Sequence, residues 1–140
     1  MTEKYKILAE FIKDMSSETP DIETYLFVKD HISKYHLTIN INSKALKNQM
    51  IEVCTTLKYE DKDANEKRSY FEINYATIIQ LIEEVKDKKE LERIILCDVQ
   101  NQVYPELEKS FLSLLHNSGY KNVKFEKKVD FEKLYNLKFN

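Results

Sequence analysis

Residues 35–42 read Tyr-His-Leu-Thr-Ile-Asn-Ile-Asn, and apolar and polar side chains alternate along them. Because every second side chain of an extended chain points to the same face, this stretch predicts a half-buried strand. The alternation returns in residues 51–59, Ile-Glu-Val-Cys-Thr-Thr-Leu-Lys-Tyr, and in residues 70–75, Tyr-Phe-Glu-Ile-Asn-Tyr. These β-branched and aromatic repeats predict three adjacent antiparallel strands.

Short polar segments separate the predicted strands. Residues 60–67 form the most polar run of the chain and predict a hairpin loop, and residues 43–48 predict a shorter connection. With one Gly and two Pro among 140 residues, neither a linker nor an internal repeat divides the chain. We therefore expect residues 1–140 to form a single domain with one core.

The first apolar segment fits two different structures. Helical spacing relates Ile7, Leu8, Phe11, Ile12 and Met15, whereas Tyr5, Ile7, Ala9 and Phe11 would line one face of a strand. Periodicity alone favours a helix.

The period changes to that of helices in the C-terminal half. Leu91, Ile94, Ile95 and Val99 predict one short helix, and Leu107, Phe111, Leu114, Leu115 and Ser118 predict a second. Pro105 suits the first turn of that second helix, and Gly119 suits the left-handed position just past its end. Asp130 is expected to cap a short terminal helix over residues 131–135.

Composition and motifs exclude several classes of function. The 22 basic and 24 acidic residues are interspersed, with a formal net charge of -2, so no basic stripe suggests nucleic-acid binding. Neither a signal peptide nor a membrane-spanning stretch is visible, which places the chain in the cytoplasm without direct membrane insertion. Cys54, Cys97 and the three histidines lack the spacing of a metal site or nucleophile, and no glycine-rich loop exists to hold a phosphate. We expect no catalysis, no metal and no cofactor.

Two motifs near the ends of the chain resemble the SecB family of export chaperones. Residues 11–20, Phe-Ile-Lys-Asp-Met-Ser-Ser-Glu-Thr-Pro, are similar to the family's Tyr-x-Lys-Asp-x-Ser-x-Glu-x-Pro. Tyr104-Pro105 and Val129 to Tyr135, Val-Asp-Phe-Glu-Lys-Leu-Tyr, are similar to the Phe-Pro and Val-Asn-Phe-Asp-x-Leu-Phe/Tyr that open its long and last helices. Residues 37–42 and Tyr70 to Ile73 resemble two of its strands.

The resemblance implies an α+β fold. A four-stranded antiparallel sheet with C-terminal helices packed on one face would assemble as a dimer of dimers, a homotetramer. The resemblance to the family overrules the helical periodicity of the first segment and makes Tyr5 to Lys13 a strand. Asn74, Tyr75 and Ala76 replace the family's glycine pair, and the chain ends at Asn140 without the tail by which many members bind zinc and SecA.

The resemblance also implies binding residues and a function. Leu37, Ile39 and Ile41 resemble positions that contact unfolded polypeptide clients, although alternating apolar residues are more often core. Tyr25 and Phe27, expected in a loop, are added as client contacts because a loop has less reason to bury them. Asp14, Glu18, Tyr70 and Glu72 correspond to positions that meet SecA, although exposed carboxylates are usually solvated charges.

The function expected is thus an ATP-independent chaperone that holds unfolded polypeptides, with a possible role in export through SecA. A dedicated module for one partner, such as an antitoxin or a phage protein, is the alternative on the same fold. A small enzyme is the third, disfavoured by the missing motifs. Client breadth separates the first two, and turnover of a small molecule would support the third.

Overall fold

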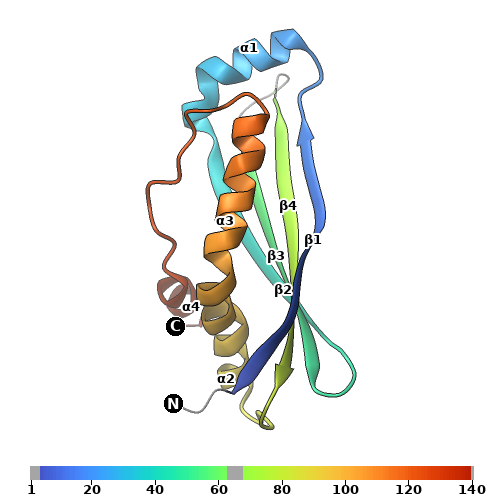
Figure 1. Ribbon diagram of the computed structural model, residues 1–140. Coiled ribbons are helices and arrows are strands. Elements are labelled where there is room, and N and C mark those ends of the chain that lie inside the picture. The colour runs from blue at the N-terminus through green and yellow to red at the C-terminus, as the bar shows by residue number, and fades with distance from the viewer. Residues whose placement is uncertain (1–3, 63–67, 140) are drawn as a thin grey trace.

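The computed structural model describes residues 4–62 and 68–139 (Figure 1). Its elements, in chain order, are β1 (Tyr5–Glu18), α1 (Ile22–His31), the 3₁₀ turn η1 (Ile32–Lys34), β2 (His36–Ala45), β3 (Met50–Glu60), β4 (Tyr70–Leu81), α2 (Lys88–Arg93), the π-helical turn η2 (Ile94–Asp98), α3 (Val99–Asn117) and α4 (Phe131–Phe139). The expected α+β fold with a four-stranded antiparallel sheet is confirmed.

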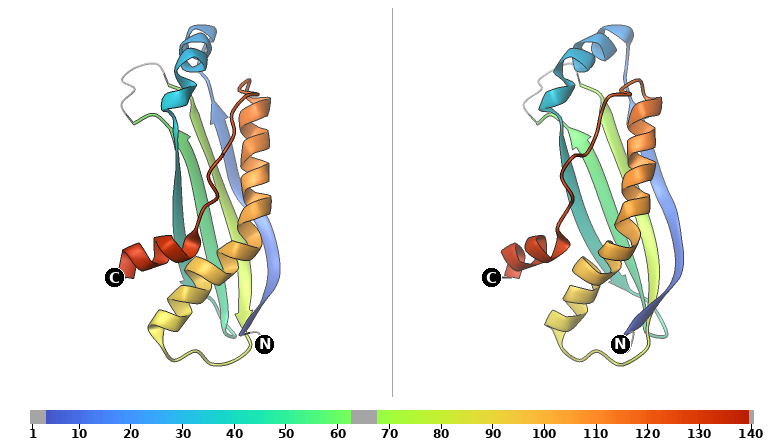
Figure 2. Two further views of the ribbon diagram at one scale, coloured as in Figure 1. Left: turned by 90° about the vertical axis from the view of Figure 1, so that its left-hand side faces the viewer. Right: turned by 60° about the vertical axis from the view of Figure 1, so that its left-hand side comes forward.

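The sheet has the order β1-β4-β3-β2, so β1 and β2 form its two edges. Each neighbouring pair is antiparallel, and β3 and β4 stand in the middle. Helices α2, α3 and α4 lie on one face of this twisted sheet, and no helix of the described residues covers the other face (Figure 2).

The first segment is the strand expected from the resemblance, and it extends beyond Lys13 to Glu18. Its register against β4 shifts between Ile7 and Ala9 and again between Ile12 and Asp14. A bulge inserts one extra residue into an alternating strand, so two bulges convert a spacing of two into spacings of three. The helical periodicity of this segment therefore arose from bulges, and the helix that it favoured is wrong.

The connection predicted for residues 43–48 is shorter than expected, because β2 continues to Ala45 and β3 begins at Met50. Asn48 and Gln49 turn the chain with φ angles of 61° and 62°. Asparagine tolerates this left-handed conformation better than most residues, since its short side chain bonds locally. Of the hairpin predicted at residues 60–67, residues 63–67 lie outside the described part of the chain.

The two predicted C-terminal helices are one helical run from Lys88 to Asn117, with η2 inserted between α2 and α3. Pro105 therefore lies inside α3 and not in a first turn. It is exposed, so the helical carbonyl that loses its N–H partner there can be hydrated.

The helix end predicted at Gly119 and the helix start predicted at Asp130 are confirmed. Gly119 follows α3 with a φ of 107°, and a Cβ at this position would come within 2.5 Å of the Tyr25 ring. The Lys133 amide donates to Asp130 Oδ1 over 3.0 Å at the start of α4.

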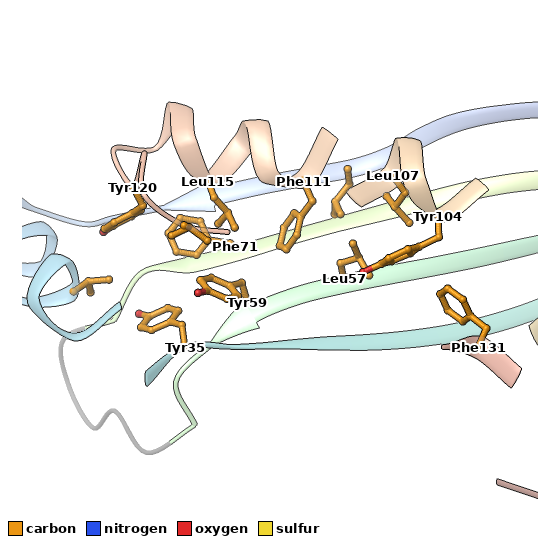
Figure 3. Close-up of a cluster of buried hydrophobic side chains, with 13 residues drawn as sticks. Tyr35, Leu57, Tyr59, Phe71, Tyr104, Leu107, Phe111, Leu115, Tyr120 and Phe131 are labelled. Carbon is orange, nitrogen blue, oxygen red and sulfur yellow. The ribbon is translucent and has the colours of Figure 1, made fainter. Parts of the chain in front are cut away.

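The core lies between the sheet and α3 (Figure 3). Leu107, Phe111 and Leu115 of α3 recur at a spacing of four residues, and all three are fully buried against Leu57, Phe71 and Ile73 of the central strands. A second cluster at the other end joins η2 and the start of α3 to Ile51, Val53 and Ile79. Between them Gln100 Nε2 donates to Thr55 Oγ1 over 2.9 Å, and both residues are completely buried. This polar pair satisfies itself and fixes α3 on β3.

Candidate functional site

Tyr25 and Phe27, expected in a loop, lie in helix α1, which carries the chain from β1 to β2 past the end of the sheet (Figure 1). Asp21 begins this helix by accepting from the Thr24 amide over 2.8 Å. Tyr25 points inward, donates from its hydroxyl to the Gly119 carbonyl over 2.9 Å and contacts the Tyr120 ring. Phe27 is 41% exposed and stacks on His31. The two residues therefore face different environments, and only Phe27 offers a free aromatic surface.

Ser69, just before β4, joins the segments at this end of the sheet. Its amide donates to the Tyr35 hydroxyl over 3.0 Å, and its hydroxyl lies 3.2 Å from the Tyr120 hydroxyl and 2.8 Å from that of Thr19. Burial raises the pKa of Tyr35, so this hydroxyl keeps its proton at neutral pH. The hydroxyl cluster holds the end of β1, the start of β2 and the loop after α3 in fixed positions.

Between these segments lies a pocket of about 510 Å³, here called the crossover pocket. Tyr59 and Tyr120 supply aromatic surface, Ile32 and Val123 add aliphatic surface, and charged side chains line the pocket as well. These charged residues are Lys29, Lys121, Lys124 and Glu126, all of them exposed.

A second pocket of about 180 Å³, the α4 pocket, lies between the edge strand β2 and helix α4. Its lining residues are Ile39, Asn40, Ile41, Leu96, Phe131, Leu134 and Tyr135, none of which is charged. Ile39 and Ile41 thus line a surface cavity as well as touching the core. Leu37 is separate: it is half-buried and pairs with Tyr59 of β3.

Helix α4, which walls this pocket, is fixed mainly at its first turn. Phe131 is buried against the Tyr104 ring, with 5.1 Å between centroids, and its carbonyl accepts from Cys97 Sγ over 3.4 Å. Arg93 and Glu132 form an exposed ion pair at 2.5 Å, and the Tyr135 hydroxyl donates to the Lys89 carbonyl over 3.2 Å. Leu134 and Leu137 are left 46% and 71% exposed on the same helix.

The residues predicted to meet SecA gather on the outer face of the sheet. Glu18 pairs with Tyr70 across β1 and β4, Ser16 pairs with Glu72, and Asp14 pairs with the next outward residue, Asn74. Glu72 accepts from the Tyr70 hydroxyl and lies 3.8 Å from Lys58 Nζ. The bond to Glu72, followed by burial and the nearby negative charges, raises the pKa of Tyr70 to about 12. The cluster is acidic, and Lys58 partly offsets its charge.

The remaining candidates for chemistry stay apart. Among residues 4–62 and 68–139, no three His, Cys, Asp or Glu side chains come close enough to hold a metal ion. Burial raises the pKa of both thiols, Cys54 and Cys97, which opposes thiolate formation. In the same described ranges, no helix has the length and hydropathy needed to cross a membrane.

Comparison with known proteins identifies the family. The model of the family described as "Preprotein translocase subunit SecB" matches residues 1–140. The chain belongs to the SecB family. A putative SecB of Pelagibacter ubique (strain HTCC1062) is 59% identical over the full length of both chains. The SecB of Rickettsia bellii (strain OSU 85-389) is 27% identical, over 94% of this chain and 86% of that one.

A solved SecB-like structure has the same fold. It is a SecB-like chaperone of Mycobacterium tuberculosis in complex with a ChAD peptide from the HigA1 antitoxin. Its TM-score is 0.64 at 10% identity, over 89% of this chain and 91% of that one, so the likeness concerns the fold alone. The SecB family and its chaperone function in protein export, expected from the sequence motifs, are thereby confirmed for this chain.

The sequence did not indicate most of the pocket walls of this SecB. Tyr59 was expected only as a strand residue and Leu134 only as part of the motif at residues 129–135, and no prediction singled out Leu96 or Tyr120 as binding residues. The lysine-rich run at residues 121–128 was the one local signal of a charged wall. The roles of Tyr25, Phe27, Leu37, Ile39 and Ile41 in client binding stay predictions.

Proposed function

We propose that this SecB holds apolar stretches of unfolded polypeptide in the α4 pocket and the crossover pocket, without ATP, metal or catalysis. The observation that carries the proposal is the uncharged α4 pocket at a free sheet edge, where Ile39, Ile41 and Leu134 meet. An extended client can bury apolar side chains there and bond to the outer edge of β2, which has no strand partner among residues 4–62 and 68–139. Holding needs only this burial, and the expected setting is the cytoplasm.

Leu134→Ser tests the pocket. Because Leu134 is 46% exposed, the change should leave the fold intact. Burial of part of a leucine side chain is worth about 1 kcal/mol, so half-suppression of client aggregation should need about fivefold more chaperone. The assay follows light scattering by a chemically unfolded client diluted into buffer without nucleotide.

The matched control is Leu137→Ser, on the same helix and outside the pocket. It should suppress aggregation as the unchanged chain does. Equal suppression by both variants would contradict the role of the α4 pocket. If the unchanged chain protects one cognate partner and none of several unrelated clients, the chain is a dedicated module for that partner, such as an antitoxin.

We propose further that the acidic outer face, Asp14, Glu18, Tyr70 and Glu72, docks a basic surface of SecA. Glu72→Lys should slow association and weaken binding about three- to tenfold at low salt, because it reverses a charge on the outer face of the sheet. Stability should fall by about 1–2 kcal/mol, because the change removes the partly exposed pair with Lys58 and the bond from the Tyr70 hydroxyl. Titration against SecA from the same organism, at low and at physiological salt, measures this effect.

Glu106→Lys, at an exposed position of α3, makes the same change in net charge away from the outer face. It should leave SecA binding almost unchanged. Absence of binding by the unchanged chain at both salt concentrations would exclude the export role through this face. A homotetramer, as a dimer of dimers, is the assembly that we propose for all these activities.

A further inference from the structure

The crossover pocket differs in charge from the molecule that carries it. Three lysines and one glutamate line it, whereas the whole chain has a formal net charge of -2. Lys29 comes from α1, and Lys121 and Lys124 come from the loop after α3, so the positive charge approaches from two sides. Within the described part of the chain, none of these three lysines forms a salt bridge. Their charge is therefore available to a ligand.

The surface between the lysines suits an apolar or aromatic side chain. Tyr59 is 8% and Tyr120 is 4% exposed, and ring contacts with Tyr35, Phe71 and Phe125 hold both rings. The bond between the Tyr120 and Ser69 hydroxyls adds a further restraint. A rigid floor binds a side chain without the entropic cost of ordering the pocket.

The two pockets lie along the same edge of the sheet. Tyr59 of the crossover pocket pairs with Leu37 of β2, and Ile39 and Ile41 of the α4 pocket follow two and four residues further along that strand. At about 3.3 Å per residue these steps are about 7 and 13 Å, so an extended segment of about five residues reaches from one pocket to the other. The α4 end of this path is uncharged and the crossover end is basic.

We infer that the crossover pocket selects client segments in which an acidic residue stands within about five residues of an apolar or aromatic one. The carboxylate lies among Lys29, Lys121 and Lys124, and the apolar side chains occupy the tyrosine floor and the α4 pocket. This specificity rests on the proposed holding function and adds a charge preference to it. Because the lysines are exposed, the preference is moderate and weakens as salt screens it.

Three synthetic peptides test the preference. They share one apolar-aromatic core and end in two Asp, two Gln or two Lys residues. Fluorescence anisotropy should show the acidic peptide binding about three- to tenfold more tightly than the neutral one at low salt, and the basic peptide binding most weakly. The differences should shrink at about 0.3 M salt.

A triple variant and a matched control locate the effect. Lys29→Gln, Lys121→Gln and Lys124→Gln together should abolish the preference, so that the acidic, neutral and basic peptides bind this variant with similar affinity. Lys47→Gln, Lys86→Gln and Lys109→Gln remove the same charge from exposed positions outside the pocket, so they should retain most of the preference.

Each other outcome has a distinct meaning. Equal affinity for the three peptides, or a preference that survives in the pocket variant, would overturn the charge preference. The holding function would still stand in that case if the unchanged chain suppresses aggregation of a client. If none of the peptides binds and no client is protected, the holding function fails, and the inference fails with it.

Discussion

Phe111→Ala is expected to lower the free energy of unfolding by about 3–5 kcal/mol, the range found when a buried phenylalanine leaves a cavity. Phe111 is completely buried at the centre of the larger core cluster. Its ring also stacks on Phe125, with 6.3 Å between centroids, so it supports the loop that carries Lys121 and Lys124. Urea unfolding followed by circular dichroism measures the loss.

Leu114→Ala provides the comparison on the same helix. Leu114 is only half-buried, so its truncation should cost clearly less than that of Phe111. Both variants need the same protein concentration, because assembly stabilises the folded chain by mass action. A similar small loss for both would show that α3 does not anchor the core as the packing implies.

The strands after α1 were predictable because a single physical rule governs them. In β3, residues 51–59 alternate between the helical layer and the outer face, and the buried set is the apolar set with one threonine. The period-two alternation of apolar and polar residues does not hold in β1. This strand lies at an edge, both its faces are largely exposed, and two bulges disturb its period, so only the resemblance to a family identified it as a strand.

In the C-terminal helical half, local sequence signals predicted some features, and others depend on tertiary packing. Gly119 and Asp130 were correctly placed, because a left-handed residue and an N-cap are set by neighbouring residues. Pro105 was misplaced, because proline is also tolerated on the exposed side of a helix that began earlier. The run through η2 is stabilised by burial of Ile94, Ile95 and Cys97, which is a tertiary effect.

The candidate site was only partly predictable, because its walls come from segments that are far apart in the sequence. Ile39 and Ile41 were proposed from the resemblance to family positions and do line a pocket, but the opposite wall comes from η2 and α4, more than 50 residues later. Tyr25 was proposed as a loop residue, whereas a helix turns it inward against Gly119. The lysines of the crossover pocket come together only when α1 and the loop after α3 meet, through the bond of Tyr25 to the Gly119 carbonyl and its contact with the Tyr120 ring.

The proposed assembly makes a second prediction of large effect. Leu8, Phe11, Ile12 and Met15 of β1 are each 43–46% exposed, on a strand whose outer edge has no partner among the described residues. A second copy would cover these side chains and satisfy the free backbone groups of β1. In a symmetric antiparallel pairing about a two-fold axis, residues near the middle of the strand meet their own copies. The midpoint of Tyr5–Glu18 falls between Phe11 and Ile12.

Phe11→Lys with Ile12→Lys should therefore place like charges opposite each other and prevent pairing of the two β1 strands. Static light scattering should give the mass of four chains for the unchanged protein and a much smaller mass for this variant at the same micromolar concentration. Ile22→Lys, at a 71% exposed position on α1, controls for replacing an exposed apolar residue by lysine and should keep the mass of four chains. A monomeric mass for the unchanged protein would rule out the tetramer. An unchanged mass for the double variant would move the interface away from β1.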